Sequence, residues 1–120
     1  MTITSLLFRR ASAVLGQIGV FETQSYRIQI EVRCREDGIM CNNVSYVGTN
    51  KKTGKSIRLR GRTVHSYASD GVTPTQFQGY SFTNGSTEYF VSEHGYLEVR
   101  RGDKILFYEE GKWDWVENEK

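Results

Sequence analysis

Two histidines and two cysteines are the side chains of this sequence best suited to catalysis or metal binding. A serine or cysteine nucleophile needs a histidine beside it as a base, and only His65 and His94 are available. Neither histidine lies in a recognisable catalytic motif, and His94 precedes Gly95 in a turn-like segment. The two also lack the H-x-H or H-x-x-x-H spacing of metal ligands. The sequence therefore predicts no catalytic residue, no metal site and no cofactor, and a protein that is not an enzyme.

Two further patterns suggest chemistry at first sight. Residues 48–56 begin with glycine and end in Gly-Lys-Ser, but this spacing is one residue longer than that of a phosphate-binding loop. The residues that follow alternate as in a strand, whereas a phosphate loop leads into a helix. Adjacent carboxylates at 36–37 and 109–110 would point to opposite faces of a strand, unlike a pair of glycosidase acids facing each other across a cleft. We interpret these carboxylates as solvated charges.

Cys34 and Cys41 flank a short segment that contains the turn pair Asp37-Gly38. A hairpin at this turn would place the two cysteines opposite each other, within the few ångströms that a disulfide spans. The alternative is a pair of reduced thiols at the end of a strand. We favour the disulfide because the turn lies between the cysteines and no cysteine is left over.

Basic residues cluster between positions 51 and 62, with no acid among them. Arg58, Arg60 and Arg62 alternate along an expected strand, so they share one face at intervals of about 7 Å. This interval is close to the phosphate spacing of a nucleic-acid strand. The net charge is only +2, and acidic residues dominate the C-terminal end, which would repel a long polyanion. We therefore expect a basic and an acidic pole.

A second candidate surface is the irregular segment 68–75, which holds the only proline of the chain. Loops of this kind carry contacts to partners more often than strands do, and exposed tyrosines beside them are suited to anchor a protein. The candidate binding residues from both surfaces are Arg58, Arg60, Arg62, Lys51, Lys52, Tyr67, Asp70 and Tyr96.

The elements that must position these residues are short antiparallel strands. Tyr26–Val32 alternates apolar and polar residues with period two, which is typical of a half-buried strand. From Phe77 onward, aromatic-rich runs are interrupted by Asn84-Gly85, His94-Gly95, Arg101-Gly102-Asp103 and Glu110-Gly111, each suited to a tight turn. The other strands that we expect are 44–49, 55–64, 77–82, 87–92, 96–100, 104–108 and 113–116.

These strands predict an all-β fold, with the possible addition of one short N-terminal helix. Seven Tyr, six Phe and two Trp provide more apolar surface than one face of a flat sheet can bury. An open meander would also leave two edges unpaired. We therefore predict an antiparallel meander of about seven or eight strands, rolled into a small β-barrel or tightly curled sheet. We assign residues 1–22 to an N-terminal arm, a short helix or a remnant targeting segment, and 23–120 to a single β domain.

The leading functional hypothesis is a non-enzymatic binding module, exported to the periplasm or secreted by a bacterium, that inhibits or neutralises another protein. The predicted disulfide and the absence of a catalytic set support it. One alternative is a cytoplasmic barrel that binds single-stranded nucleic acid through the hairpin 51–62. A second alternative is a carrier with a ligand inside the barrel. No membrane span is expected; the oligomeric state is open, with an edge-strand homodimer as one option.

Overall fold

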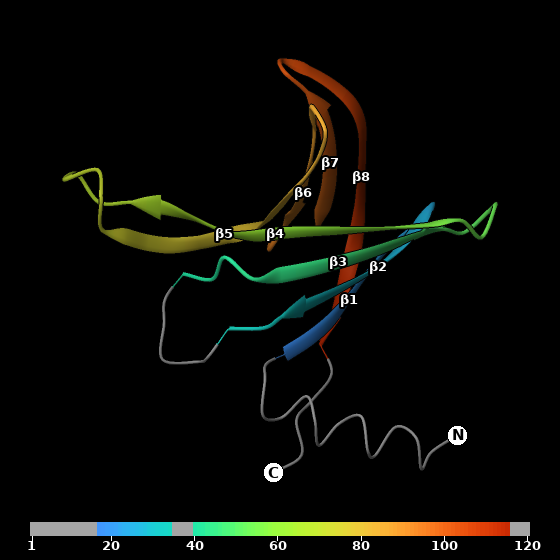
Figure 1. Ribbon diagram of the computed structural model, residues 1–120, viewed down its shortest axis with the longest axis horizontal. Helices are drawn as coiled ribbons and strands as arrows, with labels where there is room; N and C mark the ends of the chain where they lie inside the picture. The colour runs from blue at the N-terminus through green and yellow to red at the C-terminus, as the bar shows by residue number, and fades with distance from the viewer. Residues whose placement is uncertain (1–16, 35–39, 116–120) are drawn as a thin grey trace, which may run out of the picture.

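The computed structural model describes residues 17–34 and 40–115, which form eight strands and no helix (Figure 1). Every strand pairs antiparallel with its neighbour in sequence, and the last strand pairs with the first, which closes a barrel. The predicted all-β barrel is thus confirmed. No membrane-spanning helix occurs in the described ranges. The strands are β1 (Gln17–Thr23), β2 (Tyr26–Val32), β3 (Val44–Asn50), β4 (Ser56–Tyr67), β5 (Pro74–Asn84), β6 (Thr87–Ser92), β7 (Tyr96–Arg101) and β8 (Lys104–Trp115).

Strand β1 lies within the segment that the sequence assigned to an N-terminal arm. Residues 17–23 pair with β2 on one side and with the end of β8 on the other. Phe21 is fully buried, between Ile28 and Trp113 in the register. The barrel therefore begins at Gln17 rather than at position 23. The rest of the predicted arm, residues 1–16, lies outside the described residues.

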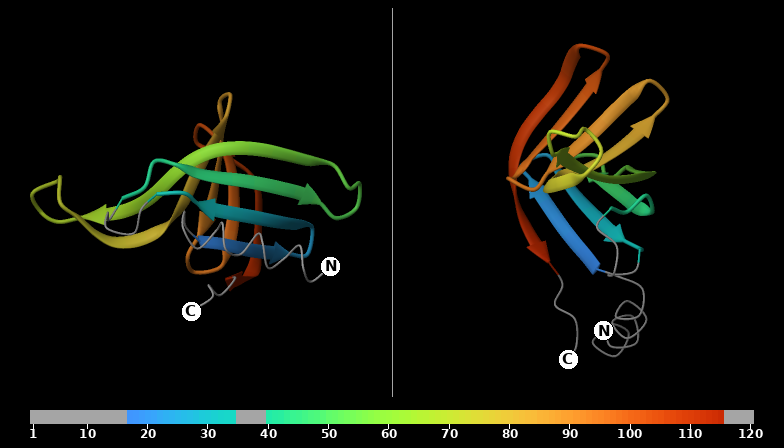
Figure 2. Two further views of the ribbon diagram at one scale, coloured as in Figure 1. Left: turned by 60° about the horizontal axis from the view of Figure 1, so that its bottom comes forward. Right: turned by 90° about the vertical axis from the view of Figure 1, so that its left-hand side faces the viewer.

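Strands β4 and β8 are each twelve residues long and exchange partners midway. The first half of β4 pairs with β3 and its second half with β5. The first half of β8 pairs with β7, and residues 111–115 pair with β1. The barrel consequently consists of two wings that meet at these exchange points, one built on β1 to β3 and the other on β6 and β7 (Figure 2).

Glycines occupy the positions where the strands exchange partners. Gly61 pairs with both Val44 and Phe82, and a Cβ atom there would overlap the carbonyl oxygen of Ser81. A Cβ atom at Gly111 would likewise overlap the carbonyl oxygen of Glu22. The sequence predicted a turn at Glu110-Gly111 and a separate strand at 113–116. Instead β8 runs through Gly111, because a residue without a side chain lets one strand bend closely past another.

The barrel interior is packed with aromatic rings. Phe21 and Trp113 lie 5.0 Å apart between ring centres, and Tyr46 and Phe82 lie 4.9 Å apart. These tilted arrangements are the ones that aromatic quadrupoles favour, and each such ring also removes a large apolar area from water. The fully or almost fully buried core residues are Phe21, Ile28, Ile30, Val44, Tyr46, Phe82, Val91 and Leu97.

A disulfide joins Cys34 and Cys41, with 5.8 Å between their Cα atoms, as the sequence predicted. Cys41 is buried and belongs to the core cluster. Its amide donates a hydrogen bond to Thr63 Oγ1 at 2.9 Å, which connects the disulfide to β4. The turn predicted at Asp37-Gly38 lies in residues 35–39, outside the described residues.

The close approach at Gly61 makes a prediction about stability. We expect Gly61→Ala to lower the free energy of unfolding by about 2 to 3 kcal/mol, because backbone rather than a flexible side chain occupies the space of the new methyl group. Ser86→Ala, in the exposed turn between β5 and β6, should change it by less than about 0.5 kcal/mol. Urea denaturation of both variants measures this. Equal stabilities would show that Gly61 is not required for the bend.

Candidate functional site

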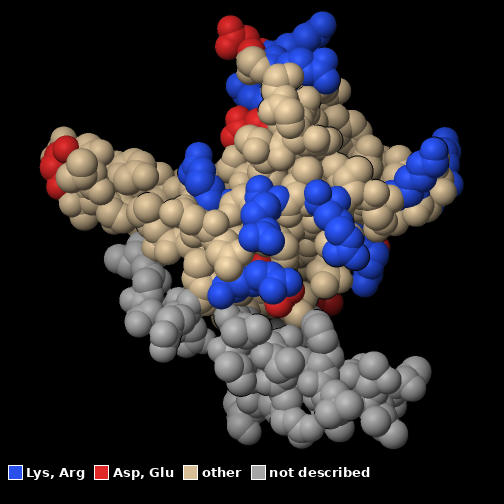
Figure 3. Space-filling view, in the orientation of Figure 1, with Lys and Arg blue, Asp and Glu red and all other residues tan. Residues whose placement is uncertain are grey.

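The three arginines of β4 lie on the outer face of the barrel, as their alternation predicted. Arg58, Arg60 and Arg62 are exposed, whereas the intervening Leu59 packs against the core. Among the described residues, no carboxylate forms an ion pair with any of these three side chains. Basic side chains are spread over the middle of the face shown in Figure 3. Within the part of the chain that the structure describes, these three arginine charges therefore have no ion-pair partner.

The surface around Arg60 is hollowed on both sides. One hollow of about 370 Å³ lies over β2 to β4 and includes Glu31 and Arg33. The other, about 520 Å³, lies beyond Arg62 and includes Ser81 and Glu88. Both hollows are wide open, and Ser81 Oγ hydrogen-bonds Glu88 at 2.7 Å within the second. They are open depressions in the surface rather than enclosed cavities.

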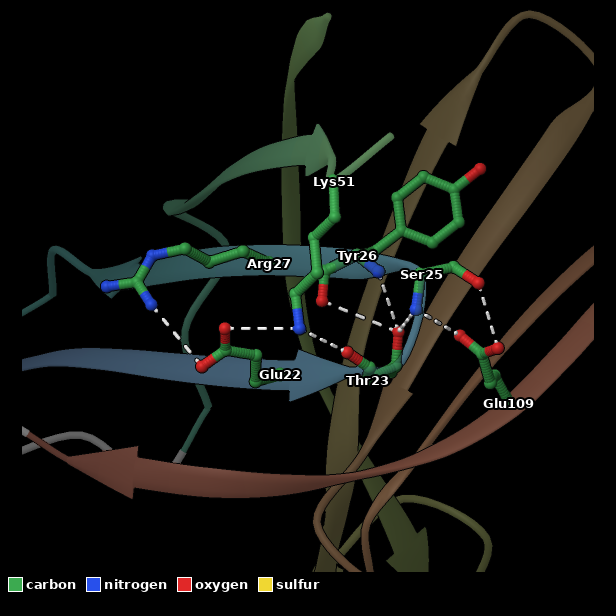
Figure 4. Close-up of polar contacts among 7 residues, drawn as sticks. All are labelled: Glu22, Thr23, Ser25, Tyr26, Arg27, Lys51 and Glu109. Atoms are coloured by element: carbon green, nitrogen blue, oxygen red, sulfur yellow. Dashed lines mark hydrogen bonds and ion pairs between the residues drawn. The ribbon is translucent and has the colours of Figure 1, made fainter. Parts of the chain in front are cut away.

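Lys51, which the sequence predicted as a binding residue, contacts the end of β1 in the structure (Figure 4). Its Nζ donates to the carbonyl oxygen of Thr23 at 2.6 Å and lies 3.2 Å from Glu22 Oε2. The hydrogen bond from Lys51 is the main cause that lowers the pKa of Glu22. The Lys51 amide also donates to the carbonyl oxygen of Ser25. Lys52, next in sequence, is exposed and forms no ion pair within the described residues.

Glu109 completes this network from β8. Its two carboxylate oxygens accept hydrogen bonds from the Ser25 amide at 3.0 Å and the Ser25 hydroxyl at 2.9 Å (Figure 4). The C-terminal acids up to residue 115 do not form a single pole, because Asp103 and Asp114 lie near opposite ends of β8. Glu109 is therefore a structural residue that holds the turn between β1 and β2 against β8.

Tyr67 and Asp70 lie at the end of an arm that projects from the barrel. The arm is the second half of β4 paired with the start of β5, and its tip is the loop 68–73 (Figures 1 and 2). Asp70 organises this loop. Its Oδ1 accepts from the amides of Val72 and Thr73, both at 2.9 Å, and its Oδ2 accepts from the Thr73 hydroxyl at 2.5 Å.

The same hydrogen bonds lower the pKa of Asp70 to about 2, with the bond from the Thr73 side chain as the largest cause. Two backbone bonds close the loop further, from Ala68 to Thr73 and from Gly71 back to Ala68. The loop at the tip is thus held by hydrogen bonds among its own residues. Val72 is 72% exposed there, and Tyr67 is 52% exposed. Tyr67 and Asp70 were among the residues proposed from the sequence, whereas Val72 was not, because its exposure depends on the geometry of this loop.

Tyr96, the last candidate, lies on the outer face of β7 and is half-buried. Its ring stacks on Tyr108 with 5.2 Å between centres, and Phe90 lies 6.0 Å from it on the other side. Tyr108 is the exposed member of this row, at 51%. Tyr96 is therefore separated from the arm and from the arginines, on a different wing.

The two histidines lie in unrelated surroundings. His65 is inside β4, where its Nε2 lies 3.1 Å from Thr63 Oγ1 and its ring packs against Phe77. Its Nδ1 is buried without a partner among the described residues. His94 is exposed in the turn after β6, and its amide donates to Ser92 Oγ. Residues 17–34 and 40–115 contain no group of three or more potential metal ligands.

One further feature was not visible in the sequence: a pocket of about 440 Å³ at the open end of the barrel, between the two wings. Comparison with known proteins adds no functional information, since no family model, no curated protein and no solved structure matches this chain.

The hydrogen bonds of Asp70 predict how the tip responds to pH. Because the folded pKa, about 2, lies below the ordinary 3.8, the stabilisation is complete above about pH 4 and is lost as pH falls through 2. Thr73→Val removes the hydroxyl whose hydrogen bond lowers the pKa of Asp70 most, so it should raise this pKa toward 3.8. NMR titration of the Asp70 carboxylate and of the Val72 amide measures both effects. An unchanged titration in Thr73→Val would contradict the role of this hydroxyl.

Proposed function

We propose that this protein is a non-enzymatic binding module that inhibits or neutralises another protein, with the tip of the β4–β5 arm as its principal contact. The observation that carries the proposal is the internally bonded loop 68–73, which holds Val72 out in solvent at the end of the arm. A small apolar side chain on a projecting loop is suited to enter a cleft of a partner. A flat or concave surface of similar composition would not fit such a cleft.

The fixed conformation of the tip matters because flexible side chains and loops lose conformational entropy when two proteins bind. A loop that is already held in one conformation loses less entropy on association than a flexible loop of the same sequence. Three hydrogen bonds to one carboxylate provide this order at the tip. Tyr67, exposed where the arm joins the loop, adds the kind of amphipathic ring that is enriched in interface hot spots.

The arginine face lies on the same strand and supports the proposal electrostatically. Arg58, Arg60 and Arg62 alternate along β4 before the tip, and none of them forms an ion pair with a described carboxylate. A row of charges of one sign accelerates encounter with a partner of the opposite sign. We therefore propose a partner that is acidic around the cleft that receives Val72.

The disulfide supports an oxidising location for this module. Structural disulfides persist outside the cytoplasm and are rare within it, where thiols are kept reduced. The bond between Cys34 and Cys41 therefore favours export to the periplasm or the medium. A partner in those compartments would be a secreted or surface-exposed protein.

Site-specific photo-crosslinking in the native host tests the arm as the contact. We expect a benzophenone side chain at position 72 to yield an adduct of defined mass with one partner, and the same group at exposed position 86 to yield none. With the purified partner, Val72→Ser should weaken binding about tenfold or more, which corresponds to the loss of one buried Val side chain. Equal adducts at both positions, or no adduct at 72, would remove the arm from the proposal.

A second candidate function, binding of single-stranded nucleic acid, is favoured by one observation: three adjacent arginines without ion pairs on one strand face. If these side chains contact three phosphates, log Kd should change with log salt with a slope of about 2. Replacing all three with Gln should flatten that slope, whereas Arg101→Gln on β7 should not. Fluorescence anisotropy with a labelled oligonucleotide measures this. Absence of binding at low salt would exclude this function.

A further inference from the structure

The pocket at the open end of the barrel has the properties of a small-molecule site. It lies beside the first half of β4, which pairs with β3 but not with β5. The two wings diverge there. One wing contributes Tyr26 and Tyr46, and the other contributes Tyr89, Val99 and Phe107. Its volume of about 440 Å³ is within the range of small-ligand sites, which are concave and mostly apolar. The aromatic side chains that line the pocket belong to the buried core or pack against it.

The three tyrosines provide unused polar groups within these apolar walls. Among the described residues, no hydrogen bond joins the hydroxyl of Tyr26, Tyr46 or Tyr89 to another protein group. Tyr46 is only 2% exposed, and its burial raises the pKa of the phenol, with Tyr89 and Tyr26 as further causes. It therefore remains a neutral donor. Gly48 lies against its ring, and a side chain at that position would displace it.

The rim of the pocket carries one positive charge. Lys55 lines it, and Lys55 forms no ion pair with a described carboxylate. Its backbone is held by the turn, because its carbonyl oxygen accepts from Asn50 and its amide donates to Thr53 Oγ1. None of the described residues that line the pocket is acidic, and Glu109 of β8 is hydrogen-bonded to Ser25. The mouth of an apolar pocket therefore favours a negative group.

We propose that this pocket binds a small amphipathic anion, with a flat apolar body between the aromatic walls and one carboxylate or sulfonate at Lys55. Phenol hydroxyls within an otherwise apolar wall provide a few polar contacts for orientation, as in other small-ligand sites. A sugar would leave most of its hydroxyls without partners against these walls, and this cost disfavours it. The site is separate from the arm, since Lys55 precedes β4 and the tip follows it. Ligand binding in the pocket can therefore be tested independently of the proposed partner protein.

Two fluorescent naphthalene probes test this proposal on the full-length protein. Anilinonaphthalene sulfonate carries the anionic group, and N-phenyl-1-naphthylamine has a similar body without charge. We expect both to bind in a saturable 1:1 manner with increased fluorescence. Lys55→Gln should weaken binding of the sulfonate about three- to fivefold, as for loss of an exposed ion pair, and leave binding of the neutral probe unchanged. Lys52→Gln, in the same turn, should change neither.

Two further variants locate the probes. Val99→Trp fills the pocket and should abolish binding of both, with circular dichroism to confirm that the barrel is folded. Ile57→Glu places an acid at the rim, where the native side chain is 38% exposed and its loss does not open the core. It should weaken the sulfonate probe more than the neutral one. Val72→Ser should affect neither probe. Binding that is absent, or that persists in folded Val99→Trp, would overturn the proposal.

Discussion

The closure of this barrel depends on a steric constraint at two glycines. β4 and β8 each begin in one wing and end paired with the other, so each must bend closely past a neighbouring backbone. Gly61 and Gly111 lie at these bends, where any side chain would overlap a carbonyl oxygen. Gly79 of β5 has the same role against Val91, and its φ of 151° is one that glycine adopts readily. The wings, the core between them and the angle at which they diverge all follow from these bends.

The same bends create both candidate binding features. Because β4 leaves β5 at Gly61, its first half diverges from the second wing and leaves room for the aromatic pocket. Its second half continues with β5 past the barrel and forms the arm. Pocket and tip are thus opposite ends of one strand, with the arginine face between them. A barrel of shorter strands, each paired along its whole length, would have neither feature.

The sequence predicted the elements whose signals are local. Alternation identified β2, paired turn residues separated β5 to β8, and the spacing of the two cysteines indicated their bond. β1 was missed because Gln17 and Gly19 dilute its apolar pattern, and its strand conformation depends on pairing with β2 and β8. Glu110-Gly111 has the composition of a turn, yet the bend there is made within a strand.

In the candidate site, the sequence could predict the position of a side chain only where a local pattern determines that position. Alternation placed the three arginines on one face, but the role of Lys51 depends on Thr23 and Glu22, which are distant in sequence. The exposure of Val72 results from the hydrogen bonds of Asp70, and the pocket results from the relative orientation of two wings. Neither is encoded by a local pattern. The first and last strands of the barrel pair with each other. During synthesis, the barrel therefore cannot close until residues 111–115 are available to pair with β1. Until then, an unclosed meander exposes two pairing edges, and exchange of β1 between two such chains would close both as an intertwined dimer.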